Sequence, residues 1–229
     1  MLGLVTIGQA PRDDIVASMF GNAGVAGIVQ AGALDLLSPD EIRLLAPLPA
    51  EHPLVTRLVG GDEVVVSKHR LLTYVARAIE RLEAERCPII CVLCTGEFPR
   101  LGKSALIVYP DRLLVGVVDA LLPDGTLGIL MPHAGQRESM LAKWTTATRA
   151  TVTGIASPYS AADQVAAEIR MLDSLGAQAV VLDCMGFDRE MLANARGATT
   201  VPVLLANGVV GSILAELAGK SIRLFDQVD

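Results

Sequence analysis

Two cysteines occupy the same point of two similar segments of this chain. IICVLCTGEF (residues 89–98) and AVVLDCMGF (residues 179–187) each run from apolar residues into Cys-x-Gly, which places Cys94 and Cys184 ninety positions apart. A thiolate can remove a proton from a carbon atom, a thiol can return one, and a thiolate can also attack as a nucleophile. Two such groups on opposite sides of one small molecule would form an acid/base pair.

Each cysteine follows an apolar run that predicts a buried parallel strand, and each precedes a predicted helix start. Ligands of open parallel α/β sheets bind outside the carboxyl ends of the strands, so we expect both thiols at such an edge. A helix N-terminus stabilises a thiolate, and lowering the thiol pKa by roughly 1.5 units would leave half of the thiol ionised at pH 7. The sequence therefore predicts two activated cysteines.

A structural role is the competing interpretation, because cysteine is among the residues most often buried in protein cores. Repetition of the position favours a function for the pair. Cys87 and Cys91 have no counterpart in the second half and are predicted to be core residues. CVLC (91–94) also fits C-x-x-C, but residues three apart in a strand point to opposite faces. With no second cysteine pair and only 3 histidines, the sequence predicts no metal site.

Further polar residues follow the predicted strands. Arg12 could hold an anion through two parallel hydrogen bonds, or it could pair with Asp13 or Asp14. Thr95 could offer its hydroxyl and amide to a carboxylate, or it could cap a helix. The other residues predicted to line a ligand cleft are Thr6, Gln9, Ser67, Lys68, Gly96, Met185, Gly186 and Asn207.

Short apolar runs alternate with amphipathic helical patterns along the chain, as is typical of parallel βαβ units. The clearest helices are predicted over residues 69–85 and 161–175, the second ending at Gly176. The predicted strands are residues 4–7, 63–66, 89–93, 105–109, 126–131, 151–155, 179–183 and 201–205.

The repeat extends beyond the cysteines. In the same ninety-residue register Val75 and Ile79 align with Val165 and Ile169. If six extra residues are allowed later in the chain, Asp111 aligns with Asn207. The segments TIGQAPRDD and MPHAGQRES, at the start of each half, also match. Agreement through helix, strand, cysteine and glycine in one register predicts two similar α/β lobes with a cleft between them.

The lobes are predicted to divide near residues 122–126. The helix after the last strand of each half could cross to the other lobe, so we expect a first lobe of residues 1–122 plus 206–229 and a second of residues 123–205. Residues 34–61, rich in proline and charge, have no counterpart in the second half. This insertion could be a lid or a partner-binding hairpin.

The composition limits the partners. The 229 residues are 52 % hydrophobic but only 3 % aromatic, which predicts a core of Val, Leu, Ile and Ala. A net charge of -6 and a pI near 5.1 argue against nucleic acid or an anionic membrane as partner. The N-terminus lacks a signal-peptide pattern, and no apolar stretch reaches the roughly 18 residues of a membrane helix. We therefore expect a cytoplasmic protein with reduced cysteines.

The segments TIGQAPRDDI, VVVSKHRL, LDCMGF and VPVLLAN together resemble the AroM family, and the resemblance runs essentially from end to end. LDCMGF and TIGQ-x-PR-x-D are its most specific parts. That family is similar to the aspartate/glutamate racemase superfamily, which includes amino-acid and hydantoin racemases, maleate isomerase and arylmalonate decarboxylase. The resemblance implies two pseudosymmetric flavodoxin-like lobes, a C-terminal helix that returns to the first lobe, and cofactor-independent chemistry between two cysteines.

Carried over by resemblance, Cys94 with Thr95 matches the first cysteine and its following polar residue, and Cys184 matches the second cysteine. Met185 stands where the racemases usually have threonine, a departure that removes a hydroxyl contact to an amino-acid substrate.

Three functional hypotheses follow. The first is a cofactor-independent racemase, isomerase or decarboxylase acting on a small carboxylate or similar anion, with Cys94 and Cys184 as the acid/base or nucleophilic pair. The second is a non-catalytic binding or regulatory protein that keeps the fold and the cleft. The third is a decarboxylase-like enzyme that uses one cysteine. A homodimer is a possible assembly for each.

Overall fold

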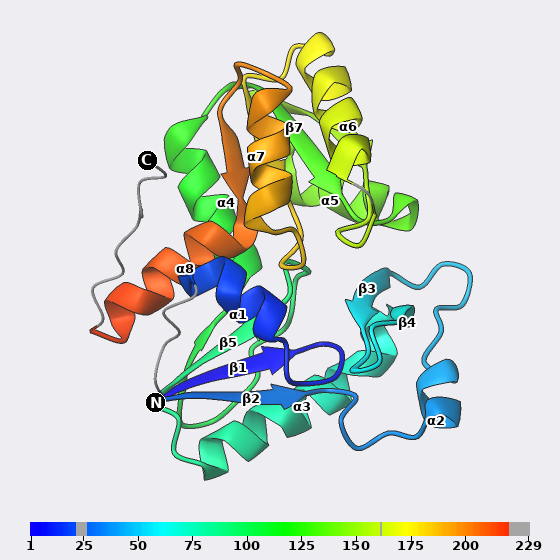
Figure 1. Ribbon diagram of the computed structural model, residues 1–229, viewed down its shortest axis with the longest axis vertical. Coiled ribbons are helices and arrows are strands. Elements are labelled where there is room, and N and C mark those ends of the chain that lie inside the picture. The colour runs from blue at the N-terminus through cyan, green and yellow to red at the C-terminus, as the bar shows by residue number, and fades with distance from the viewer. Residues whose placement is uncertain (22–26, 161, 220–229) are drawn as a thin grey trace.

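The computed structural model describes residues 1–21, 27–160 and 162–219 (Figure 1). Residue 161, with which one predicted helix begins, and residues 220–229, the end of the predicted first lobe, lie outside the described residues. No helix in the described ranges is long and apolar enough to cross a membrane.

Two four-stranded sheets, each parallel throughout, form the centres of the two lobes. In chain order the first lobe's strands are β1 (Leu2–Thr6), β2 (Ile28–Gly32), β5 (Ile89–Leu93) and β6 (Leu106–Val108). Those of the second lobe are β7 (Gly125–Met131), β8 (Arg149–Ile155), β9 (Ala179–Leu182) and β10 (Val203–Leu205). The spatial orders are β2-β1-β5-β6 and β8-β7-β9-β10, the same arrangement twice. The predicted α/β fold of two pseudosymmetric lobes is confirmed.

Equivalent glycines show how closely the two lobes match. A Cβ atom added at Gly3 of β1 or at Gly128 of β7 would lie 2.9 Å from a neighbouring side chain, too close for any other residue without movement. The nearest neighbours are Leu82, Cys87 and Ile90 for Gly3, and Leu172, Ala177 and Val180 for Gly128. These two sets are related by the ninety-residue shift. Helix and strand therefore pack in the same way in both lobes.

Two of the helices were predicted closely, α3 (Lys68–Ala84) and α6 (Ala162–Ser174). The inner face of α3 is fully apolar, and Gly176 follows α6 with a φ of 84°, a left-handed conformation that glycine adopts without strain. The remaining helices are α1 (Asp13–Phe20), α2 (Pro39–Arg43), α4 (Pro110–Leu121), α5 (Arg137–Trp144), α7 (Arg189–Gly197) and α8 (Ala206–Leu217), with a 3₁₀ turn at Ala134–Gln136.

The helix that follows each sheet's last strand joins the lobes. Leu114 of α4 and Val210 of α8 belong to one buried cluster with Leu4 of β1 and Ile129 of β7. Helix α8 crosses α1 so closely that a Cβ at Gly211 would lie 2.7 Å from the carbonyl oxygen of Met19. Figure 1 shows α8 lying beside α1 at the junction of the two lobes. A continuous apolar core therefore holds the sheets in a fixed relation.

The end of the inserted segment, residues 53–57, forms a separate hairpin with residues 63–67. Strands β3 (Pro53–Arg57) and β4 (Glu63–Ser67) pair antiparallel, so residues 63–66 do not belong to a parallel sheet as their apolar run suggested. The hairpin reaches the second lobe, where Gln136 Nε2 donates to the carbonyl oxygen of Pro53 at 3.0 Å and Ser157 Oγ donates to Glu63 Oε2 at 2.5 Å. The insertion therefore spans the cleft between the lobes.

Candidate active site

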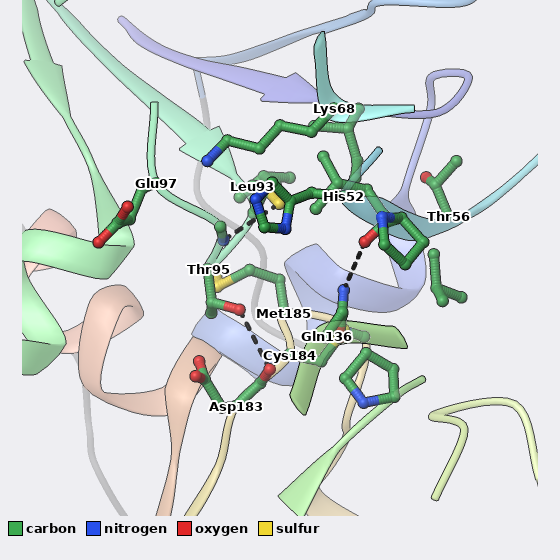
Figure 2. Close-up of a pocket in the computed structure, with 18 of the residues that line it drawn as sticks. His52, Thr56, Lys68, Leu93, Thr95, Glu97, Gln136, Asp183, Cys184 and Met185 are labelled. Atoms are coloured by element: carbon green, nitrogen blue, oxygen red, sulfur yellow. Dashed lines mark hydrogen bonds between the residues drawn. The ribbon is translucent and has the colours of Figure 1, made fainter. Parts of the chain in front are cut away.

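A cavity lies between the two lobes at the carboxyl ends of β5 and β9 (Figure 2). About 60 Å³ of this cavity is open to a water-sized molecule, enough for a few waters at roughly 10–15 Å³ each. Of the predicted site residues, those that line it are Thr6, Arg12, Lys68, Cys94, Thr95, Gly96, Cys184, Met185 and Gly186. The structure thus brings both cysteines and most of the predicted polar residues to one space.

The two sulfur atoms have equivalent local partners. The backbone N–H of Gly96 donates to Cys94 Sγ at 3.4 Å, and that of Gly186 donates to Cys184 Sγ at 3.4 Å. Each cysteine therefore sits in the same tight turn, two residues before a glycine whose amide faces the sulfur. An amide donor of this kind favours the thiolate over the neutral thiol.

The predicted helix starts after the cysteines are wrong. Between Cys94 and Pro110, where α4 begins, the chain contains only turns and the short strand β6, and α7 begins five residues after Cys184. In the described part of the chain, neither cysteine is therefore followed directly by a helix start. In both lobes the glycine amide donates to the sulfur where a helix N-terminus was expected to do so. The Cys-x-Gly spacing allows this contact but does not by itself reveal it.

Burial dominates the ionisation of both thiols. It raises the pKa of Cys94 to about 12 and that of Cys184 to about 11, although the glycine amides act in the opposite direction. The charge of Cys184 further raises the pKa of Cys94, so the two thiols do not ionise together. Burial therefore opposes the activation of the two thiols that the sequence predicted.

A buried ion pair, which the sequence did not predict, joins the two cysteine turns. Lys143 Nζ lies 3.0 Å from Asp183 Oδ2 and 2.9 Å from the carbonyl oxygen of Thr95, and the lysine and aspartate side chains are 2 % and 0 % exposed. Trp144 Nε1 donates to Asp183 Oδ2 at 2.8 Å, and Thr95 Oγ1 donates to the Asp183 carbonyl at 3.1 Å. The residue after one cysteine is thus bound to the residue before the other.

On another wall, the guanidinium group of Arg12 is already paired. Its Nε and Nη2 donate to the two carboxylate oxygens of Asp14 at 2.8 and 2.7 Å, so the ion-pair alternative describes its contacts. Arg12 Nη2 also donates to the hydroxyl oxygen of Tyr159 at 3.3 Å. Burial raises the pKa of Tyr159 to about 12, and the hydroxyl keeps its own proton for donation.

Positive charge without an ion-pair partner enters the cavity from the first residue of α3. Lys68, the residue after β4, forms no ion pair with any residue that the structure describes. Figure 2 shows its ammonium group near His52 and across the cavity from Asp183. His52 was missed from sequence, because its place depends on the hairpin. An anion could bind on this side.

Gln136 supplies an unsatisfied acceptor. Its side chain is buried in the cavity wall, with Nε2 bound to Pro53, while Oε1 has no hydrogen-bond partner in the described part of the chain. Buried polar atoms in native proteins are almost always hydrogen-bonded. Gln136 Oε1 is therefore available to an N–H or O–H group of a bound molecule.

The structure places three predicted cleft residues elsewhere. Gln9 binds backbone groups of Leu34 and Val59, and Ser67 Oγ caps α3 by accepting from the amide of residue 70. Asn207 is fully buried behind the second cysteine turn, where Nδ2 donates to the carbonyl oxygens of Met185 and residue 187. All three side chains point into the protein rather than into the cavity. They therefore hold neighbouring chain segments in position and do not line the cleft.

The cavity wall combines two thiols, hydroxyl and amide donors, the ammonium groups of Lys68 and Lys143, and several apolar side chains. Within the described ranges, no three His, Cys, Asp or Glu side chains are grouped as metal ligands. The arrangement can hold a small anion and move protons on either side of it.

Solved structures with the same fold define the class of protein. Picrophilus torridus aspartate racemase is 16 % identical with a TM-score of 0.57, each chain covered to 98 %. Arylmalonate decarboxylase is 12 % identical with a TM-score of 0.63, covering 99 % of this chain and 100 % of that one. Nocardia farcinica maleate cis-trans isomerase is 14 % identical with a TM-score of 0.60, covering 96 % and 92 %. The fold is that of the aspartate/glutamate racemase-like proteins.

The family is narrower than the fold. The AroM protein family model matches residues 2–218, so the chain belongs to the AroM family, as its motifs predicted. No curated protein sequence matches it.

Breaking the buried ion pair should destabilise the protein strongly. Lys143→Met leaves the Asp183 carboxylate buried with only the indole of Trp144 as side-chain donor, so we expect the unfolding free energy to fall by about 3–5 kcal/mol. Urea denaturation measures this change. The exposed pair of Lys103 and Glu80 is the control, and Lys103→Met should cost less than about 1 kcal/mol. Equal losses in both variants would show that the buried pair has no special role.

The raised thiol pKa values predict how alkylation depends on pH. Iodoacetamide labelling of Cys94 and Cys184, followed by peptide mass spectrometry, should accelerate from pH 7 to pH 10 without reaching a plateau. In Cys184→Ala, Cys94 should react at an unchanged rate near pH 7 and faster only as the pH approaches 11, where Cys184 would otherwise carry a negative charge. A plateau below pH 8 would show instead that the thiols are activated.

The same shifts affect stability. Both folded-state values lie above the ordinary value of 9.0, so the folded state prefers the protonated thiols. Their contribution to stability is complete below pH 9 and is lost as the pH rises toward 11 to 12.

Proposed function

We propose that this protein is a cofactor-independent enzyme of the racemase or isomerase type, in which Cys94 and Cys184 move protons to and from a small carboxylate. One observation carries the proposal: two cysteines with equivalent glycine-amide contacts line one cavity from two lobes. A structural role for either cysteine alone does not account for this equivalence.

The proposed reaction needs no group beyond the two thiols and the substrate. The thiolate of one cysteine removes the proton from the carbon next to the substrate carboxylate, and the C–H electron pair stays on the substrate as an enolate-like anion. The thiol of the opposing cysteine then gives its proton to the other face of that carbon. One sulfur has gained a proton and the other has lost one, so charge and atoms balance.

A high thiol pKa makes the thiolate a stronger base for this step but lowers its population near pH 7. The proton on a carbon beside a carboxylate is very weakly acidic, and a base of higher pKa removes it with less unfavourable free energy. The amides of Gly96 and Gly186 offset part of the cost of placing the charge on sulfur. The ammonium group of Lys68 compensates the carboxylate charge.

The cavity wall also narrows the substrate class. The free acceptor of Gln136 favours a substrate with an amino or hydroxyl group, while Met185, Leu54 and Ile7 form an apolar wall suited to a short carbon chain. We therefore infer a small hydroxy or amino carboxylate as the ligand.

Hydrogen exchange at the α-carbon tests the proposal. The protein is incubated in D₂O with a panel of amino, hydroxy and dicarboxylic acids, and loss of the α-proton signal is followed by NMR. Exchange of at least one compound should fall by about 10²-fold or more in Cys94→Ala and in Cys184→Ala, because each removes a proton-transfer group. Cys87→Ala, which changes a buried cysteine outside the cavity, should leave exchange unchanged.

Other outcomes distinguish the alternatives. Loss in only one variant would favour the enzyme that uses a single cysteine. The high thiol pKa values favour the alternative of a non-catalytic binding protein, because they leave little thiolate near pH 7. Binding of a carboxylate without hydrogen exchange in any compound would support that alternative and contradict the proposal.

A further inference from the structure

A second hollow lies between α4 and α5, outside the cavity of the cysteines. It is a surface groove whose lining includes Asp111, Val115 and Gly116 of α4. Lys143 and Glu97 line both the groove and the central cavity, so the two spaces are separated by little more than these side chains.

Asp111 is the unusual group in this groove. The residue is only 6 % exposed, and its Oδ1 has no hydrogen-bond partner among the described residues. A buried carboxylate oxygen is costly unless a donor or a cation compensates it. Burial raises the pKa of Asp111, although the positive charges of Lys143 and Arg112 act in the opposite direction.

The other lobe shows what this position does when it is satisfied. Asp111 is the second residue of α4, and Asn207 is the second residue of α8. Asn207 holds the cysteine turn of its lobe by donating to the carbonyl oxygen of Met185 and accepting from a serine hydroxyl. The equivalent carbonyl oxygen in the first lobe, that of Thr95, is bound by Lys143. Asp111 is therefore not needed to hold its turn.

Two of the other charged groups of the groove are in ion pairs, whereas Arg112 is hydrogen-bonded to a backbone carbonyl. Lys143 pairs with Asp183, Asp119 lies 2.8 Å from Arg149, and the Arg112 guanidinium donates to a backbone carbonyl at 3.0 Å. Asp111 and Glu97 form no ion pair with a described residue, and neither does Arg112, so the unpaired groups of the groove carry one net negative charge.

Space for a ligand body lies beside this charge. A Cβ added at Gly116, a little more than one helical turn from Asp111, would meet no atom within 4 Å. Val115 forms an apolar part of the lining. A short alkyl group fits this part of the groove better than a hydrated inorganic ion does.

We propose that the groove between α4 and α5 is a second ligand site, which binds a small primary ammonium compound through Asp111 and Glu97 with its alkyl body along Val115 and Gly116. This site is separate from the proposed reaction of the cysteines and does not depend on it.

Calorimetric titration of the full chain with propylammonium chloride tests the site. We expect saturable binding of one equivalent of propylammonium. The Asp111→Asn variant removes the charge and gives α4 the residue that α8 has at the equivalent position, and it should bind at least tenfold more weakly. Gly116→Leu should weaken binding similarly by filling the groove. Glu138→Gln, which changes an exposed carboxylate of α5 outside the groove, should bind as the unmodified protein does.

Three results would overturn the proposal. The first is the absence of saturable binding by propylammonium. The second is binding that stays within twofold in both Asp111→Asn and Gly116→Leu, which would place the ammonium elsewhere. The third is equally tight, Asp111-dependent binding of potassium or magnesium chloride, which would show an inorganic cation site. Unfolding curves of the variants verify that each is folded.

Discussion

The buried pair of Lys143 and Asp183 is the interaction on which the arrangement of the site depends. Removing two charges from water costs several kcal/mol per ion, and only complete hydrogen bonding makes such a pair tolerable. Here the indole of Trp144 and the carbonyl oxygen of Thr95 provide those bonds. The partners belong to both cysteine turns and to α5, so this local network also fixes the two sulfurs relative to each other.

Around this network the two lobes are alike in backbone and different in side chains. Strand order, the close-packed glycines of the central strands and the glycine amides at sulfur are repeated. The support of the cysteine turns is not repeated, because Asn207 holds one turn and Lys143 the other. Burial and Asp183 raise the pKa of both thiols, whereas the cation that lowers it is Lys143 for Cys94 and Arg12 for Cys184. Two thiols with one geometry therefore have different electrostatic surroundings.

The sequence predicted the lobes and the paired cysteines because these depend on local patterns and on the repeat. Strands β2 and β3 were missed, since each is a five-residue segment with a glycine or a proline at one end. The prediction that a helix starts directly after each cysteine was wrong, because the Cys-x-Gly segment forms a tight turn around the sulfur. Gln136 and Lys143 escaped notice because their partners lie 83 and 40 positions away along the chain. Trp144, the sole tryptophan, was the available signal that this helix face is buried.

The central claim is that the Cys94 and Cys184 thiols face one shared space. Reaction of the folded protein with dibromoacetone at pH 9, followed by peptide mass spectrometry, tests it most directly. A bridge joining the peptides of Cys94 and Cys184, with Cys87 and Cys91 unmodified, is the predicted result. Single adducts on separate cysteines, or a bridge that includes Cys87 or Cys91, would contradict the claim.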